Sequence, residues 1–193
     1  RRGLKTPIRR GAGPLPPEEL NPRLLQIRVE TRAAFDIVGL SGQISGLFSP
    51  SPNFATEVPL LWRNFLETAQ LEPSRSRLGV LEVSRSPDNG QSFPYWAAVE
   101  ADDQLNLEGL QRLRVPAQQY AVVPFQGPIE ALEKTLSWFI RYWLPGSGYQ
   151  GRYGYDLEVY HAGFNFDNNQ VVMEYWVPIQ PEFNWSSPVS LSL

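Results

Sequence analysis

One acidic side chain stands in an aromatic stretch of this sequence, where it could hold a cation or accept a proton. Residues 153–164 read YGYDLEVYHAGF, and aromatic and β-branched residues favour strands. Successive side chains of a strand point to opposite faces, so Asp156, Glu158 and Tyr160 share one face while His161 points away. Glu158 therefore lies either on a wet surface or at the charged floor of an aromatic pocket, and we favour the pocket.

A carboxylate among aromatic rings suits ligands that are both cationic and lipophilic. Aromatic faces attract cations by about 0.5–2 kcal/mol each, and a desolvated carboxylate attracts them more strongly than it would in water. The rings also supply apolar area without demanding one ligand shape. The chain has six tryptophans and eight tyrosines to line such a pocket. The predicted ligand-binding residues are Glu158, Tyr160, Trp62, Phe65, Trp96, Tyr120, Phe125, Trp138, Phe164, Tyr175 and Trp176.

Some of these residues have a second interpretation. Phe65 and Trp138 have the spacing of core residues on helices. The facing of Trp96 and Trp176 depends on strand register, because a slip of one residue reverses it. Glu174 also stands in a strand among aromatic residues, so it is an alternative buried acid.

The residue content excludes several kinds of chemistry. There is no cysteine and only one histidine, His161, which excludes disulfides, thiolate metal sites and histidine metal clusters. The sequence has no Gly-x-Ser-x-Gly elbow, phosphate loop or dinucleotide fingerprint. No apolar run approaches the ~20 residues of a membrane span. We therefore expect a soluble cytoplasmic protein with no cofactor, no metal and no membrane partner.

The net charge of −3 is unevenly distributed along the chain. Residues 1–10 hold five basic residues, whereas the rest holds twelve basic and twenty acidic residues. An acidic body disfavours nucleic acid, and the basic head either touches phosphates or is a solvated tail. Prolines and glycines mark residues 1–24 as a linker. We predict one folded domain over 25–183 and a tail over 184–193.

Hydrophobic periodicity predicts the order β-α-β-β twice. The predicted segments of the first half are a β-rich stretch over 24–42, a helix over 56–71 with Thr56 as its N-cap, and strands over 78–84 and 94–101. Those of the second half are a strand over 117–127, a helix over 128–144, and strands over 155–163 and 170–180.

A short echo between the halves supports duplication. Leu81-Glu82-Val83 and Leu157-Glu158-Val159 both fall at the first strand after a helix, and Glu82 is expected at the surface. Two such halves predict an α+β fold, in which an antiparallel sheet carries both helices on one face. A ligand pocket is then expected at the pseudo-twofold seam.

Seven segments together resemble a known family. They are FDIVGLSG, LLWRNF, LGVLEV, YWAAVEA, VPAQQYAVVPFQGPIEAL, YDLEVY and MEYWVPI. Their order and spacing, over about 27–180, resemble the GyrI-like small-molecule-binding domain, the effector-binding domain of AraC/XylS-type and MerR-type regulators. The most specific pieces are VPAQQY leading into a strand that ends at Gly127, the Glu-x-Tyr strand, and EYWVPI.

The resemblance implies a duplicated β-α-β-β fold and a pocket whose glutamate pairs with cationic lipophilic ligands. That glutamate matches Glu158, and Tyr160 completes the Glu-x-Tyr pattern. Sensors of this family carry a helix-turn-helix domain before this one. RRGLKTPIRRG resembles the segment that joins the two domains in AraC-type regulators. DNA is therefore expected to be a partner only through a domain outside these 193 residues.

The resemblance also leaves other functions open. Some GyrI-like proteins are hydrolases of reactive small molecules. In that case Glu158 would be the general base for water, and Tyr160 or Tyr120 would orient the water. Gyrase inhibitors of the family are protein-binding modules. The basic, proline-rich head fits a fragment of a regulator better than a free-standing hydrolase, so we predict a ligand sensor rather than an enzyme.

Overall fold

The computed structural model describes residues 26–45, 49–72, 75–83, 92–102, 108–161 and 170–182. The predicted linker over 1–24, the tail over 184–193 and the candidate Phe164 lie outside the described residues. None of the helices in these ranges is long and apolar enough to cross a membrane.

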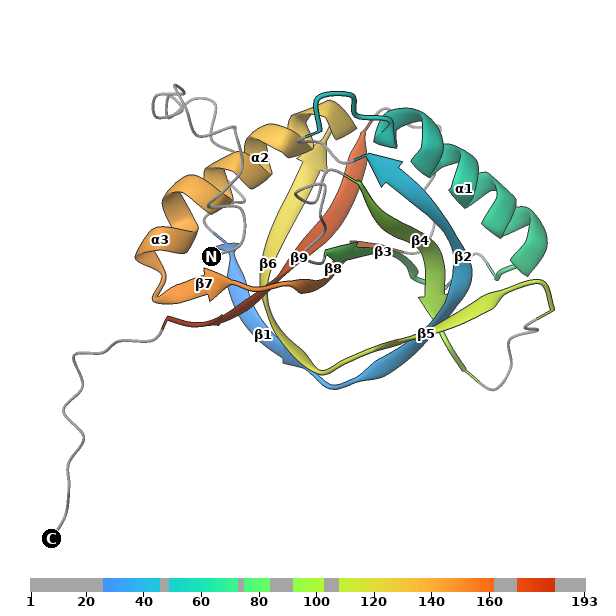
Figure 1. The fold of residues 1–193 in the computed structure, drawn as a ribbon, viewed down its shortest axis with the longest axis horizontal. Coiled ribbons are helices and arrows are strands. Elements are labelled where there is room, and N and C mark those ends of the chain that lie inside the picture. The colour runs from blue at the N-terminus through green and yellow to red at the C-terminus, as the bar shows by residue number, and fades with distance from the viewer. Residues whose placement is uncertain are drawn as a thin grey trace, which may run out of the picture.

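An antiparallel sheet forms the body of the domain (Figure 1). Its strands are β1 (Arg28–Arg32), β2 (Phe35–Ser45), β3 (Arg77–Val83), β4 (Ser92–Glu100), β5 (Gln111–Val115), β6 (Gln118–Gly127), β7 (Tyr149–Gly151), β8 (Gly154–Tyr160) and β9 (Val171–Pro181). They lie in the order β1-β6-β9-β8-β3-β4-β2-β5, and β7 pairs with β9 at one side of this path. The predicted α+β class with an antiparallel sheet is confirmed.

The two predicted halves meet at the centre of this sheet. One half consists of β3, β4 and β2, in order from the centre of the sheet outward, and the other consists of β8, β9 and β6. In each half these are, leaving the short β7 aside, the first strand after the helix, the second strand after it and the strand before it. The seam itself is the antiparallel pair β3–β8. The short strands β1 and β5 were not predicted as separate elements. Each pairs with the half other than the one it leads into along the chain.

This exchange of edge strands ties the halves together. β1 leads into β2 but pairs with β6, and β5 leads into β6 but pairs with β2. The sheet is so strongly curved that Arg32 on β1 donates to Glu100 on β4 at 2.6 Å, across many intervening strands. A sheet with this curvature has an enclosed side as well as the side that carries the helices (Figure 1).

Both helical segments lie on the same side of the sheet, as predicted (Figure 1). Helix α1 (Phe54–Ala69) turns Trp62 and Phe65 into the core. It begins two residues before the predicted start, and its N-cap is Asn53 rather than Thr56. The Asn53 side chain does not cap the helix; its oxygen instead accepts the backbone N–H of Ser45 at 2.6 Å.

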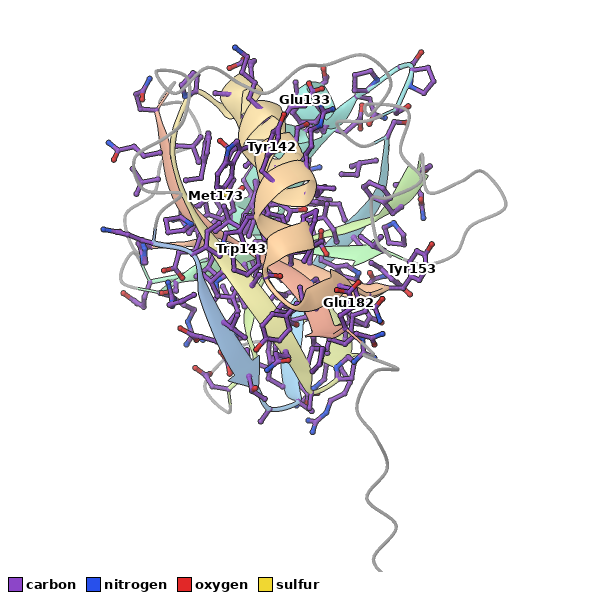
Figure 2. The ribbon with its side chains drawn as sticks, turned by 90° about the vertical axis from the view of Figure 1, so that its left-hand side faces the viewer. Glu133, Tyr142, Trp143, Tyr153, Met173 and Glu182 are labelled. Carbon is purple, nitrogen blue, oxygen red and sulfur yellow. The ribbon has the colours of Figure 1, made fainter. Side chains whose placement is uncertain are left out.

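The second helical segment is continuous but irregular. A 3₁₀ turn (Ile129–Ala131) leads into α2 (Leu132–Trp138), then a π-helical turn (Phe139–Trp143) and the short α3 (Leu144–Gly146). The π-helical turn ends two residues before Pro145. Proline has no N–H to donate to the carbonyl four residues earlier, and its ring clashes with that carbonyl, so a regular α-helix cannot continue through this residue. Figure 2 shows this segment in front of the sheet, with Tyr142 and Trp143 labelled along it.

The sheet has a packed cluster on each face. The helix-side cluster lies between the sheet and the helices, and its largest members are Trp62, Phe65, Tyr95, Phe125, Phe139, Tyr160 and Tyr175. The far-side cluster lies on the opposite face, and its members are Phe35, Ile37, Leu78, Val80, Trp96, Ala98, Val115, Tyr120, Val122, Leu157 and Trp176. The central strands are therefore covered on both faces, which explains their nearly continuous burial.

Candidate functional site

The Glu158 side chain lies at the seam between the two halves. It stands on β8, opposite Gly79 of β3 on one side and Tyr175 of β9 on the other. Only 8% of the residue is exposed, so it is not a surface glutamate. Its carboxylate contacts Tyr95 and Tyr160, both of which belong to the helix-side cluster.

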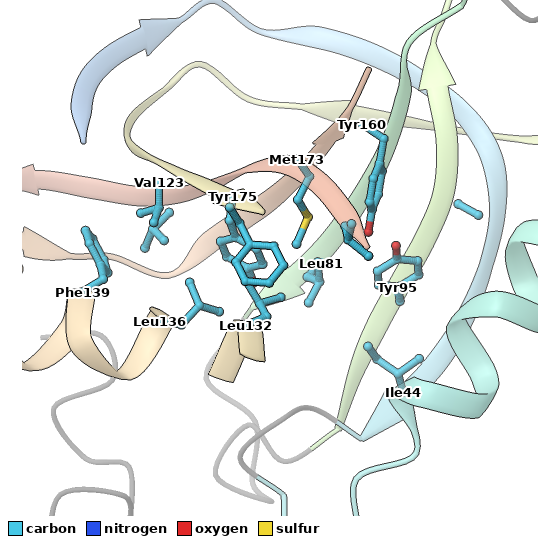
Figure 3. Close-up of a cluster of buried hydrophobic side chains, with 14 of the residues drawn as sticks. Ile44, Leu81, Tyr95, Val123, Leu132, Leu136, Phe139, Tyr160, Met173 and Tyr175 are labelled. Atoms are coloured by element: carbon cyan, nitrogen blue, oxygen red, sulfur yellow. The ribbon is translucent and has the colours of Figure 1, made fainter. Parts of the chain in front are cut away.

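Three side chains hold the Glu158 carboxylate in a short hydrogen-bond chain. The hydroxyls of Tyr95 and Tyr160 both donate to Oε2, at 2.6 and 2.7 Å. The indole Nε1 of Trp62, from helix α1, donates to the Tyr95 hydroxyl at 2.9 Å. Figure 3 shows the two tyrosines with their hydroxyls facing one another. Both of these hydroxyls bond the same oxygen, and no hydrogen bond from the described residues reaches Oε1.

A glycine makes the room for this arrangement. A Cβ added at Gly79 would lie well inside van der Waals contact of both Glu158 Oε2 and the Tyr95 hydroxyl oxygen, and 3.0 Å from Tyr95 Cζ. The carboxylate and the hydroxyl thus occupy the space above the glycine backbone. A residue with a side chain at this position of β3 would separate the two groups.

The electrostatics of the site follow from its burial. Desolvation raises the pKa of the Glu158 carboxyl, and repulsion from Asp156 acts in the same direction. The hydrogen bonds from Tyr95 and Tyr160 oppose this rise of the pKa, because they stabilise the charged form. Burial also raises the pKa of both tyrosine hydroxyls well above the usual value, so both remain protonated donors.

A second carboxylate lies two residues away on the same face of β8. Asp156 is only 4% exposed, and the hydroxyl of Tyr175 donates to its Oδ2 at 2.8 Å. Tyr175 belongs to the helix-side cluster, where Figure 3 shows it beside Met173 and Leu132. The seam therefore presents two buried acids, each held by a tyrosine.

The structure brings some predicted residues to Glu158 and places others elsewhere. Those on the helix side are Tyr160, Trp62, Phe65, Phe125 and Tyr175, with Trp138 packed at the edge of the cluster. Trp96, Tyr120 and Trp176 belong to the far-side cluster, on the opposite face of the sheet from Glu158. Strand alternation is the reason, because successive side chains point to opposite faces. The neighbours of these three residues that lie on the helix side are Tyr95, Ala121 and Tyr175.

The far-side residues have their own partners. The Tyr120 hydroxyl accepts a bond from buried Gln118 at 2.6 Å and its ring packs edge-on against Trp176. Tyr120 is therefore not placed to orient a water at Glu158, whereas Tyr95 and Tyr160 are. The Trp176 indole donates to Glu174 at 3.2 Å.

The alternative acid, Glu174, has a different environment. Arg28 makes a two-pronged ion pair with it, at 2.8 and 3.0 Å, and the carboxylate is partly exposed. This pairing lowers the pKa of Glu174 despite the opposing effect of burial. Glu174 is thus already paired with a protein cation, whereas the hydrogen bonds of Glu158 within the described residues come from tyrosine hydroxyls.

The echo between Glu82 and Glu158 does not hold in three dimensions. Leu81 belongs to the helix-side cluster, but Leu157 belongs to the far-side cluster. Glu82 therefore faces the far side, opposite Tyr155 in the ladder, and it is half-buried rather than at the surface. The two triplets match in sequence but differ by one residue in register.

Sequence reasoning missed three residues of the site: Tyr95, Gly79 and the role of Asp156. Tyr95 adjoins Trp96, and the sequence analysis named Trp96 as the ligand-binding residue because the register was unknown, whereas Tyr95 is the one on the same face as Glu158. A glycine inside the predicted strand LGVLEV is a signal of close approach that could have identified Gly79. Among the described residues, no group of three or more histidine or acidic side chains could hold a metal ion.

Comparison with known proteins gives one family and several related folds. The family model described as "GyrI-like small molecule binding domain" matches residues 25–180. The transcriptional regulator BrlR of Pseudomonas aeruginosa is 27% identical over 164 residues, which are 81% of this chain and 56% of BrlR. The chain therefore spans just over half the length of this curated relative.

Two solved structures show the same fold at low sequence identity. The structure of SAV2435 bound to tetraphenylphosphonium has a TM-score of 0.59 at 15% identity, and the match covers 80% of this chain and 93% of that one. The C-terminal domain of EcmrR has a TM-score of 0.56 at 12% identity, over 81% of this chain and 98% of that one. EcmrR has also been solved in complex with DNA, where the match covers 58% of its chain.

Proposed function

Because this chain belongs to the GyrI-like small-molecule-binding domain family, we propose that it binds lipophilic cations at Glu158 and acts as the ligand sensor of a transcriptional regulator. The observation that carries this proposal is the buried Glu158 carboxylate, held by Tyr95 and Tyr160 at the seam of the fold. A desolvated acid surrounded by rings is unfavourable in isolation, and a cation with apolar substituents would neutralise it without rehydrating it.

The arrangement around the carboxylate supports a binding role. The two hydroxyls fix Oε2, and Oε1 stays open to an incoming charge. Trp62 packs edge-to-face against both Phe65 and Tyr160, and Tyr160 bonds the carboxylate. A ligand that reached Glu158 would therefore contact apolar and π surface. The relative SAV2435 binds tetraphenylphosphonium, a cation of the same class, on this fold.

The proposed regulatory role depends on a domain outside this chain. BrlR is a transcriptional regulator, and this chain matches 56% of its length. EcmrR has been solved in complex with DNA, and this chain matches 58% of the EcmrR chain in that complex. We infer that ligand binding in this domain is reported to a DNA-binding domain in the longer protein. DNA binding by the described domain alone is not part of the proposal.

The first experiment is a titration with tetraphenylphosphonium, followed by tryptophan fluorescence, because Trp62 is hydrogen-bonded within the site. Wild type is expected to bind, and Glu158→Gln to bind at least tenfold more weakly, a loss of about 1.4 kcal/mol. The amide keeps the shape and an oxygen that can accept both tyrosine hydroxyls.

Two controls isolate the charge of Glu158. Glu174→Gln removes an acid from the neighbouring strand on the other face, and it should change the affinity less than twofold. Tetraphenylborate matches the shape of tetraphenylphosphonium with the opposite charge, and it should not bind. Wild-type binding that is absent, or equal in Glu158→Gln, would refute the proposal; a loss confined to Glu174→Gln would move the site to the other face.

A further inference from the structure

The seam contains two buried carboxylates, and the proposed function uses only one of them. Asp156 and Glu158 stand two residues apart on the same face of β8, so their Cα atoms are about 7 Å apart. Both are more than nine-tenths buried. A pair of like charges this close in a desolvated site is costly unless a cation or a proton offsets it.

The tyrosines that hold the two carboxylates come from both halves of the fold. Tyr95 lies on β4 opposite Leu81, and Tyr175 lies on β9 opposite Glu158, which are equivalent places in the two ladders. Tyr95 donates to Glu158 at 2.6 Å, and Tyr175 donates to Asp156 at 2.8 Å. Tyr160, on β8 itself, also donates to Glu158 at 2.7 Å. The two acids are thus held by different tyrosines, Glu158 by Tyr95 and Tyr160 and Asp156 by Tyr175.

The hydrogen bonds also leave capacity for a ligand. Glu158 Oε1 receives no hydrogen bond from the described residues, although the residue is more than nine-tenths buried. Asp156 lies two residues from Glu158 on the same face of β8, and its repulsion adds to the effect of burial, which is the main cause of the raised pKa of Glu158. A second positive charge on a ligand would therefore be attracted by both acids.

We propose that Asp156 and Glu158 form a two-point anionic site, which prefers ligands with two cationic centres over ligands with one. This inference rests on the proposed function, since it assumes that cations enter at Glu158. It adds a ligand class, rigid dications whose charges are separated by about the spacing of the two acids. Asp156 then determines specificity, while Glu158 anchors every cation.

The test compares two quaternary ammonium probes by isothermal titration calorimetry at physiological salt. The dication is p-xylylene-bis(trimethylammonium), and the monocation is (4-methylbenzyl)trimethylammonium, which keeps the ring and one charge. Neither probe can lose a proton, so the comparison does not depend on ligand ionisation. We expect wild type to bind the dication at least tenfold more tightly, which is about 1.4 kcal/mol.

The ratio of the two affinities is the readout in the variants. Asp156→Asn keeps an oxygen for the Tyr175 hydroxyl, and the ratio should fall to about the twofold statistical advantage of two identical charges. Tyr175→Phe removes the hydroxyl that orients Asp156, and the ratio should take an intermediate value. Glu174→Gln, the matched acid on the other face, should leave the ratio at its wild-type value.

The outcomes separate this inference from the proposed function. A wild-type ratio below threefold, or a ratio that Asp156→Asn leaves unchanged, would overturn the two-point site while Glu158-dependent monocation binding still supports the sensor. Failure of wild type to bind either probe or tetraphenylphosphonium would overturn both. Thermal unfolding of each variant confirms that the ratios are measured on folded protein.

Discussion

Replacement of Gly79 by alanine should break the hydrogen bond between Tyr95 and Glu158. The added Cβ would overlap both Glu158 Oε2 and the Tyr95 hydroxyl, and it would lie 3.0 Å from Tyr95 Cζ. The carboxylate could swing away, but the Tyr95 ring is rigid, fully buried and hydrogen-bonded to Trp62. Relief of the overlap therefore requires the Tyr95–Glu158 bond to break.

The expected cost combines two effects of known size. Loss of a buried hydrogen bond to a charged group costs about 1.5–3 kcal/mol, and overpacking of a well-filled core costs about 1–3 kcal/mol. We expect Gly79→Ala to lower the free energy of unfolding by about 3 kcal/mol. For a chain of this size, that corresponds to a decrease in Tm of about 6–12 °C.

Urea unfolding followed by circular dichroism measures this loss, and Gly42→Ala is the matched control. Gly42 lies in β2, and its added Cβ would make only ordinary contact with the Leu61 methyl groups at 3.8 Å. Its free energy of unfolding should change by less than about 0.5 kcal/mol. Tyr95→Phe removes one of the overlapping atoms, so it should cost less in the Gly79→Ala background than in wild type. Wild-type stability of Gly79→Ala, or strict additivity with Tyr95→Phe, would refute the account of Gly79.

Three further predictions concern the same hydrogen-bond chain. The raised pKa of Glu158 means that the folded state holds this proton more tightly than the unfolded state. The stabilisation by the bound proton is therefore full below the unfolded pKa of about 4.5 and is lost as pH rises through the folded pKa. Urea titrations should show Glu158→Gln gaining stability relative to wild type with rising pH, and a pH-independent difference would contradict this. A cation competes with that proton, so tetraphenylphosphonium affinity should rise with pH in wild type and stay flat in Glu158→Gln, as fluorescence titrations at several pH values can check. Tyr160→Phe removes a bond that lowers the pKa of Glu158, and should shift the midpoint of that affinity profile to higher pH; a shift to lower pH would show that the hydroxyl does not stabilise the carboxylate.

Elements were predictable from local patterns, since periodicity and turn residues are local properties. The helix expected over 128–144 is found as one segment from Ile129 to Gly146, and the strand expected over 170–180 is found over Val171–Pro181. The short strands β1 and β5 were not predicted as separate elements. Each is defined by pairing with a distant half rather than by its own composition, so no local signal marks the break between β1 and β2.

The facing of side chains could not be predicted from the same patterns. Strands covered on both faces read as continuous hydrophobic runs, so alternation gives no sign of which side carries the helices. Trp96 and Trp176 were therefore placed with Glu158, although their neighbours Tyr95 and Tyr175 are the residues on its side. Glu158 was predicted because the Glu-x-Tyr pattern of the family marks it independently of register.

The position of the acid within the repeat shows what each half contributes to the candidate site. Both halves place a tyrosine on the second strand after the helix, with Tyr95 opposite Leu81 and Tyr175 opposite Glu158. The equivalent ladder position is therefore leucine in the first half and glutamate in the second. Leucine at this place packs into the helix-side cluster, whereas the glutamate must be desolvated and then compensated. Because β3 offers Gly79 directly opposite Glu158, the first half supplies space and the Tyr95 hydroxyl, and the second half supplies the charge. Duplication thus provides two similar frames that differ at three equivalent places, where β8 has Asp156, Glu158 and Tyr160 and β3 has glycine, leucine and valine. The charge of the candidate site and one of its two hydroxyl donors come from these differences.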